Sequence, residues 1–176
     1  NSTNIPVTLL STPLCIDPKG NEGLNPQKTE PTNPLYSLDK QQSSLVYYDK
    51  NTIVLTMPYW VKVTNSSVED SEVKKHSFVL SYDPEAMTAS DTKLKLYISH
   101  VVEDAGETVT RSNFTYAYRA YSIRAALAAF KEKTGKLPKY LELTAEINNS
   151  KDELVDKDGK ETSVERSVEY DYAFTE

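Results

Sequence analysis

The chain of 176 residues has few of the residues that bind metals, form disulfides or cradle phosphates. It contains one cysteine, two histidines and five glycines. The single cysteine, Cys15, excludes an internal disulfide, and this inventory argues against a zinc or iron–sulfur site. So few glycines also argue against a phosphate-binding loop. We therefore expect no bound metal and no cofactor.

Positive charge and long apolar runs are scarce as well. The net charge of −6 argues against nucleic-acid binding, which needs a basic surface. No apolar run approaches the ~18 residues that span a bilayer, so no transmembrane segment is expected. Residues 1–6 lack the basic and apolar regions of a signal peptide, and we interpret the chain as a mature or trimmed form.

The sequence contains no recognisable catalytic motif, neither a nucleophile elbow nor a zinc-protease helix. His76 and His100 fall on the apolar-facing side of their predicted strands and could meet, but no carboxylate or thiolate is placed beside them. We interpret them as hydrogen-bonded core histidines. Asp156 and Asp158 resemble part of a calcium loop, yet Leu154 stands where an acidic ligand is required, so a turn is favoured. No catalytic residue is assigned and no enzymatic activity is expected.

Proline is abundant at the start of the chain, where six of the nine prolines fall within residues 1–34. We predict that residues 1–43 form a proline-rich leader with one or two strands packed on the domain, and that residues 44–176 form the domain itself. Residues 17–34 are predicted to lack regular structure, because they are polar and rich in turn formers. The apolar runs at 5–10 and 35–38 are expected to be anchored on the domain, since they would otherwise lie in water.

Apolar and polar residues alternate through most of the remaining chain, as expected of half-buried strands. Several such strands separated by turns predict a mainly β fold, an antiparallel β-sandwich of about seven strands. The odd-numbered residues of 53–63, the even-numbered residues of 94–102 and the aromatic residues of 114–118 are expected to face the core. Pro58 predicts an edge or a bulge, because it lacks a ladder donor. The alternating segments are 53–63, 76–82, 94–102, 114–118, 141–147 and 164–174.

One segment has helical spacing instead. Ile123, Ala126, Leu127 and Phe130 recur at the i, i+3, i+4, i+7 positions and predict one short helix at about 122–134. We expect Ser122 to cap its start and the glycine at 135 to end it.

Tyrosine is the commonest aromatic residue, with twelve copies against four phenylalanines and one tryptophan. We favour a packing role at the core boundary, since strands prefer tyrosine and its hydroxyl reaches water. The alternative is a platform that stacks on sugar rings, with Tyr59, Trp60, Tyr116 and Tyr118 as candidate ligand-binding residues. Aromatic rings exposed on one flat sheet face would distinguish this alternative.

Five segments carry a family resemblance: 52–60, 76–83, 94–101, 118–123 and 140–147. In this order they resemble the C-terminal half of the NigD-like family of Bacteroidetes envelope lipoproteins. The resemblance implies an all-β sandwich on a lipid-anchored chain, with an anchor upstream of Asn1, outside the cytoplasm at the outer membrane or cell surface of a Gram-negative bacterium. It implies no functional residues. Residues 1–43 depart from the family, because they are too few and too proline-rich for its N-terminal OB-like barrel.

From these observations we expect a non-enzymatic cell-envelope protein that acts as a protein-interaction or structural module, with an envelope protein or a glycan as partner. The proline-rich leader suits tethering or strand donation. Two alternatives remain, a glycan-binding module that uses the tyrosine-rich sheet face and a fimbrillin-like surface subunit.

Overall fold

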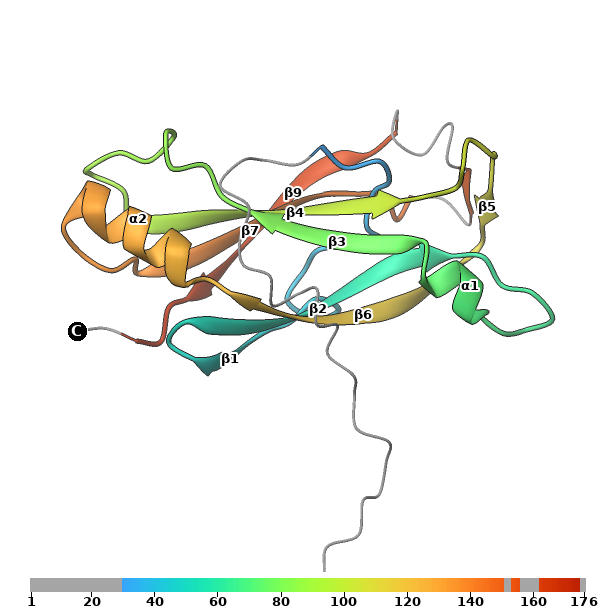
Figure 1. The fold of residues 1–176 in the computed structure, drawn as a ribbon, viewed down its shortest axis with the longest axis horizontal. Coiled ribbons are helices and arrows are strands. Elements are labelled where there is room, and N and C mark those ends of the chain that lie inside the picture. The colour runs from blue at the N-terminus through green and yellow to red at the C-terminus, as the bar shows by residue number, and fades with distance from the viewer. Residues whose placement is uncertain (1–29, 151–152, 156–161, 175–176) are drawn as a thin grey trace, which may run out of the picture.

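A computed structural model describes residues 30–150, 153–155 and 162–174. Among them, seven strands form two facing sheets, in the orders β1-β2-β6 and β3-β4-β7-β9 (Figure 1). The predicted mainly β sandwich of about seven strands is confirmed. The first sheet contains β1 (Leu45–Asp49), β2 (Thr52–Val61) and β6 (Asn113–Ser122). The second contains β3 (His76–Ser81), β4 (Lys93–Val102), β7 (Tyr140–Ile147) and β9 (Val164–Asp171).

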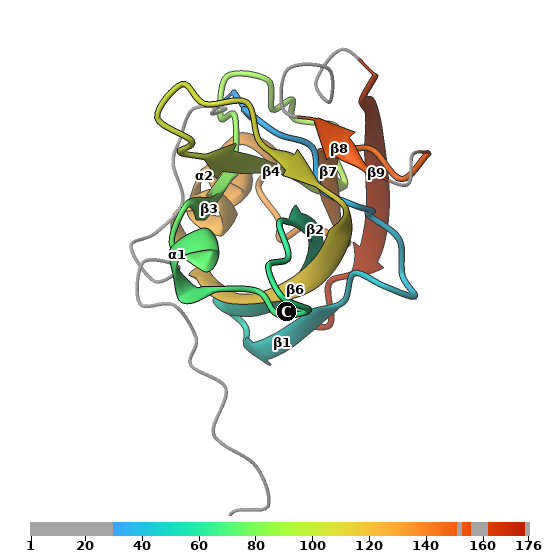
Figure 2. The ribbon, with the colours of Figure 1, turned by 90° about the vertical axis from the view of Figure 1, so that its right-hand side faces the viewer.

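A short two-stranded ribbon lies at one end of the sandwich, beside the helical turn α1 (Asp70–Val73) (Figures 1 and 2). It pairs β5 (Thr110–Arg111) with β8 (Leu154–Val155). Viewed from this end, the sheet β1-β2-β6 forms the lower wall and the strands β4 and β7 lie above it (Figure 2). No helix among the described residues is long and apolar enough to cross a membrane.

The strand pairs of the two sheets are antiparallel with one exception, the parallel pair β4 and β7. The expectation of a purely antiparallel sandwich is corrected at this pair. The chain between β4 and β7 contains β5, β6 and the helix α2 (Arg124–Thr134), and such a long connection lets the chain re-enter the sheet in the same direction.

The inward face predicted for β2 and β4 is confirmed, but the one predicted for β6 is wrong. The register pairs Met57 with Ala117 and Trp60 with Phe114. Residues directly opposite each other share one face of a sheet, so Ala117 faces the core and Phe114 faces outward. Buried core residues of β2 and β4 are Ile53, Leu55, Met57, Leu94, Leu96 and Ile98.

The helix α2 occupies one end of the sandwich and begins two residues later than predicted (Figure 1). Ser122, the expected cap, is the last residue of β6, and no side chain caps the helix at Ile123. The expected end is confirmed, since Gly135 has a φ of 74° and its N–H donates to the carbonyl of Lys131. The apolar face is also as predicted, with Phe130 fully buried.

Residues 35 and 36 tie the two sheets together through their backbone. The N–H of Leu35 donates to the carbonyl of Glu146 (2.9 Å), and its carbonyl accepts the N–H of Asn148 (2.9 Å). The N–H of Tyr36 donates to the carbonyl of Pro58 (3.0 Å). Pro58 therefore lacks its N–H on the side of this segment and not on the side of the ladder with β6. The predicted edge is met only locally, since β2 is the middle strand of its sheet but β1 pairs with it no further than Leu55.

Leu35 and Leu38 are buried, with 1% and 3% of their surfaces exposed. Burying each of these side chains is worth about 1.5–3 kcal/mol, which holds the segment on the sandwich. The other apolar run of the predicted leader, residues 5–10, and most of the predicted loop 17–34 lie outside the described residues.

Tyrosine hydroxyls link the two sheets at both of their long edges. At the β1–β9 edge, Tyr47 donates to the carbonyl of Asp171 (2.9 Å) and Tyr172 donates to the carbonyl of Lys50 (2.7 Å). At the other edge, Tyr121 donates to the carbonyl of Phe78 (2.9 Å). Burial raises the pKa of Tyr47 and Tyr172 above the ordinary value, so both remain donors at neutral pH. The predicted packing role is confirmed for these tyrosines.

Candidate functional site

The structure does not bring the four predicted ligand-binding residues together on one surface. Tyr59 is 3% exposed and lies between the sheets, where its ring centroid is 4.8 Å from that of His76 and 5.7 Å from that of His100. Trp60 follows Tyr59 in the strand and so points to the opposite face. It is only 2% exposed, and its Nε1 donates to the carbonyl of Asn148 (2.8 Å). Neither ring is free to stack on a ligand.

Tyr116 and Tyr118 do face outward from the sheet β1-β2-β6, on the same side as Trp60. Tyr36 stacks on Phe114 with ring centroids 4.2 Å apart and meets Trp60 edge-on at 5.1 Å. Phe114 meets Tyr116 edge-on at 5.9 Å. We call Tyr36, Trp60, Phe114 and Tyr116 the outer aromatic cluster. Phe114 and Tyr116 are each 40% exposed, so these two members of the cluster are partly in contact with water.

The outer aromatic cluster belongs to the part of the sheet face that β2 and β6 form, which carries no charge and which we call the uncharged face. Asp49 of β1, opposite Thr52, lies next to it at the far end. The uncharged face comprises the ten outward positions of β2 and β6, whereas a whole-chain charged content of 26% would place two or three charges there. No described helix or strand covers this face (Figures 1 and 2). Its members are Thr52, Val54, Thr56, Pro58, Trp60, Phe114, Tyr116, Tyr118, Ala120 and Ser122.

The outer face of the other sheet has the opposite character. Lys93 of β4 forms ion pairs with Glu142 of β7 (3.5 Å) and with Glu169 of β9. Lys95 and Glu146 face outward on the same sheet. Outward charges of this density are typical of a surface that stays in water. The two outer faces of one sandwich therefore present different chemistry to a partner.

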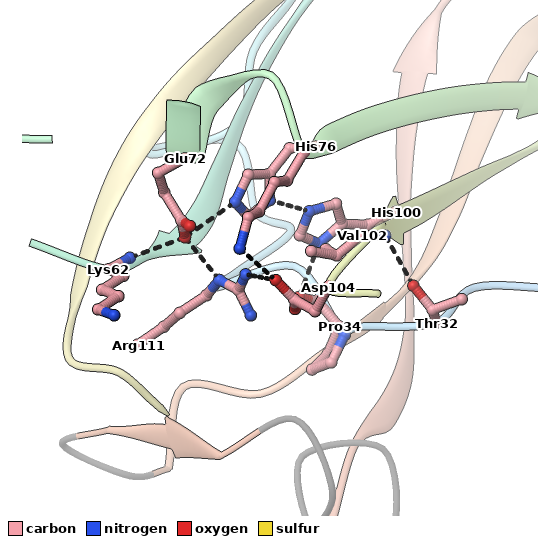
Figure 3. Close-up of polar contacts among 10 residues, drawn as sticks. Thr32, Pro34, Lys62, Glu72, His76, His100, Val102, Asp104 and Arg111 are labelled. Atoms are coloured by element: carbon pink, nitrogen blue, oxygen red, sulfur yellow. Dashed lines mark hydrogen bonds and ion pairs between the residues drawn. The ribbon is translucent and has the colours of Figure 1, made fainter. Parts of the chain in front are cut away.

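A second distinctive site is buried inside the α1 end of the sandwich (Figure 3). Arg111, which is fully buried, donates from Nε to Oε1 of Glu72 (2.8 Å) and from Nη2 to Oδ1 of Asp104 (2.9 Å). Nε2 of His76 lies 3.2 Å from the same Glu72 oxygen, and Nδ1 of His76 lies 2.9 Å from Nε2 of His100. We call these five residues the buried network.

The buried network is anchored on neighbouring backbone as well. Glu72 accepts the N–H of Lys62 (3.0 Å), and Nδ1 of His100 lies 3.2 Å from the carbonyl oxygen of Pro34. Among the described residues, every buried side-chain nitrogen or oxygen has a hydrogen-bond partner. Each buried charge thus meets an opposite charge or a polar group, as a stable interior requires.

Burial lowers the pKa of His76 to about 4 and that of His100 to about 3, so both rings are neutral at neutral pH. Two neutral imidazoles supply two N–H groups, but the chain from the Pro34 carbonyl through both rings to Glu72 contains three contacts. One of the three contacts therefore has no proton between its two atoms until the network binds an additional proton. Burial also opposes ionisation of Glu72, yet hydrogen bonds from Lys62, Arg111 and His76 outweigh it and lower the pKa.

The arrangement is suited to structure and not to catalysis. The two histidines are buried and turn their nitrogens to each other, to Glu72 and to Pro34, so no substrate atom can reach a ring nitrogen. In the part of the chain that the structure describes, no three His, Cys, Asp or Glu side chains converge as metal ligands.

Sequence reasoning missed the partners of both histidines. Glu72 stands four residues before His76, a spacing that places two side chains together on one helical turn, and this was the one available signal. Arg111 and Asp104 gave no signal, because their approach depends on the ribbon formed by β5 and β8. The exposure of Phe114 was missed because an aromatic residue in a strand was assumed to face the core.

Comparison of the sequence with protein-family models gave no match, and comparison with curated proteins gave none either. Comparison with solved structures found a similar chain, the crystal structure of a predicted lipoprotein from Bacteroides fragilis. The two chains are 27% identical and superpose with a TM-score of 0.68, over 87% of this chain and 70% of that one. This chain is therefore similar in both fold and sequence to a predicted lipoprotein of the Bacteroidetes.

Proposed function

We propose that this chain is a non-enzymatic protein of the bacterial cell envelope and that it docks on a partner protein through the uncharged face. Its similarity to a predicted lipoprotein of Bacteroides fragilis supports an envelope location. The NigD-like relation, the lipid anchor upstream of Asn1 and the outer-membrane location are part of this proposal, and the sequence patterns of residues 52–147 support them.

The absence of charge from the ten outward positions of β2 and β6 is the observation that carries the docking proposal. Protein–protein interfaces are distinguished by depletion of charged residues at their centre and by enrichment of aromatic ones. Both features meet on this face, since it carries no charge and the rings of Phe114 and Tyr116 are exposed at the end where Phe114 pairs with Trp60. Phe114 and Tyr116 are the exposed part of this face, since Pro58, Trp60 and Ala120 are buried. Adjacent exposed aromatic rings on an otherwise charged protein favour an interaction surface.

Glycan binding is the second candidate, and the exposed rings of Phe114 and Tyr116 favour it. Sugar recognition also needs polar groups placed to fix the orientation of the ligand. The uncharged face supplies hydroxyl groups from threonine, serine and tyrosine, but no amide and no carboxylate. A protein partner therefore fits the composition of the face better than a glycan does.

A charge placed on the uncharged face tests the proposal. We would introduce Tyr116→Lys into the native host and measure the size of the solubilised protein by native electrophoresis. The wild-type protein is expected in a discrete complex and the variant at the size of the free protein, since a desolvated lysine opposes docking.

Tyr97→Lys is the matched control, because Tyr97 faces outward from the charged sheet and its substitution should leave the complex intact. Wild-type protein that migrates only as the free chain would contradict the proposal, and so would a complex that survives Tyr116→Lys. If the wild-type protein forms no protein complex but binds a glycan array, and Tyr116→Lys loses that binding, the result would favour glycan binding.

A further inference from the structure

A cleft of about 480 Å³ opens beside β9, at the outer edge of the four-stranded sheet. One wall is formed by residues 37–40, and the other is formed by four consecutive residues of β9, 166–169. Consecutive strand residues point to alternate faces, so a cleft that touches all four lies along the edge of the strand and not over one face. Its apolar lining comes from Leu38, Ile147 and Val168. We call it the β9 cleft.

The backbone of β9 turns hydrogen-bonding groups toward this cleft. The N–H of Tyr172 donates to the carbonyl of Lys139 in the direction of β7 (2.8 Å). In an antiparallel pair these directions alternate, so Val168 and Tyr170 also bond toward β7, whereas Ser167 and Glu169 direct their N–H and C=O groups away from it. The carbonyl of Asp171 follows the same rule, since it accepts the hydroxyl of Tyr47 from outside the sheet (2.9 Å).

We propose that the β9 cleft binds an extended peptide segment of another protein as an additional strand on the edge of β9. Within residues 30–150, 153–155 and 162–174, no strand pairs with this edge of β9. An unpaired strand edge is a template for a further strand, and strand addition takes its affinity from main-chain hydrogen bonds. The backbone of Ser167 and Glu169 supplies two donors and two acceptors for this purpose. Alternate side chains of the peptide would enter the cleft and pack on Leu38, Ile147 and Val168.

The residues that line the β9 cleft limit the class of ligand that it can bind. The cleft is lined by Asp39 and Glu169 as well as Lys40 and Arg166, so its charges are mixed and do not select an anion or a cation. An apolar floor with a mixed polar rim suits a peptide with alternating apolar and polar residues. This site differs from the uncharged face in location and in chemistry, and it does not depend on the proposed docking of that face.

The first test asks whether the edge is open in the protein alone. Amide hydrogen exchange followed by NMR should be fast at Ser167 and Glu169 and slow at Val168 and Tyr170. Slow exchange at all four amides would show that another part of the chain already covers the edge, and this result would overturn the proposal.

The second test uses random dodecapeptides displayed on phage and selected on the wild-type protein. Selected peptides are expected to bind Ser167→Ala as tightly as wild type and Ser167→Pro at least tenfold more weakly, because proline removes an edge donor without removing a bond to β7. Failure to select any peptide would overturn the proposal, as would peptides that bind Ser167→Pro unchanged.

The third test does not depend on a variant that must fold. A selected peptide would be synthesised with N-methyl groups on alternate residues, in the two possible phases. Strand addition predicts that one phase binds as the parent peptide does and that the other loses binding at least tenfold, since only one edge of the peptide faces β9. Equal effects of the two phases would contradict strand addition.

Discussion

Tyr59 and Trp60 are consecutive residues of β2, yet they belong to two regions that treat polarity in opposite ways. Tyr59 points inward and touches both histidines of the buried network, which encloses a fully buried arginine. Trp60 points outward into a face on which ten positions carry no charge. On the inner side of β2 the protein therefore buries charged side chains, whereas the outer side of β2 carries none.

This difference indicates that the buried network stabilises the fold and that the uncharged face is available for binding. In the buried network the charges are paired with one another, so removal of one partner leaves another charge buried without compensation. On the uncharged face the rings of Phe114 and Tyr116 are each 40% exposed, so their replacement removes less buried surface than replacement of a core ring would. We expect substitutions in the first region to unfold the protein and substitutions in the second to change its interactions.

The largest effect is expected from Arg111→Met. Glu72 and Asp104 would lose the guanidinium between them, and the free energy of unfolding should fall by about 3–5 kcal/mol. Urea denaturation measures this loss. Arg124→Met is the matched control, because Arg124 is exposed on α2 and its removal should change stability by less than about 0.5 kcal/mol. Equal effects of the two substitutions would contradict the assignment of stability to the buried network.

Acid should weaken the same region by a somewhat smaller amount. The pKa values of His76 and His100 are lowered to about 4 and about 3, so between pH 6.5 and pH 4 the unfolded chain binds protons that the folded protein does not. Stability is therefore complete above about pH 6.5 and falls with pH, by about 2–4 kcal/mol between pH 7 and pH 5. The lowered pKa of Glu72 extends the loss to more acidic solutions.

Denaturation curves recorded across this pH range measure the slope. His100→Gln removes one of the two titrating rings and should reduce the slope by about half. A free energy of unfolding that stays constant from pH 7 to pH 5 would show that the histidines are not held neutral by burial.

A smaller effect separates the inward tyrosines from the outward ones. Tyr121→Phe removes a buried hydroxyl that donates to the carbonyl of Phe78 and should cost about 1 kcal/mol. Tyr118→Phe, on the uncharged face, should change stability by less than about 0.5 kcal/mol. The difference between the two melting temperatures checks this prediction, and a larger loss from Tyr118→Phe would remove the distinction between the two regions.

Local patterns predicted six of the seven strands of the two facing sheets, the helix α2 and its glycine end, because period-2 and period-3.6 spacing depend on neighbouring residues alone. The strand β1 and the ribbon of β5 and β8 were not among the predicted segments. The parallel pairing of β4 with β7 could not be predicted, since it depends on where a long connection returns. The outward direction of Phe114 is set by its register opposite Trp60, and register is a property of two strands. Aromatic content alone therefore gave the wrong face of β6.

The candidate site was predictable to a smaller extent. Strand alternation by itself places Tyr59 and Trp60 on opposite faces, so the sequence contained the reason why they do not form one platform. The meeting of His76 with His100 was anticipated from their shared face. Arg111 could not have been assigned to them, because its position depends on contacts between segments that are far apart in the chain.

The central claim is that the uncharged face is the docking surface, and in-cell photo-crosslinking tests it most directly. A photoreactive phenylalanine analogue would replace Tyr116 in one strain and Tyr97 in another, so that the two outer faces of the same protein are compared. We predict a discrete adduct with a partner protein from position 116 and at least tenfold less adduct from position 97. Equal yields from the two positions, or no adduct from position 116, would contradict the claim.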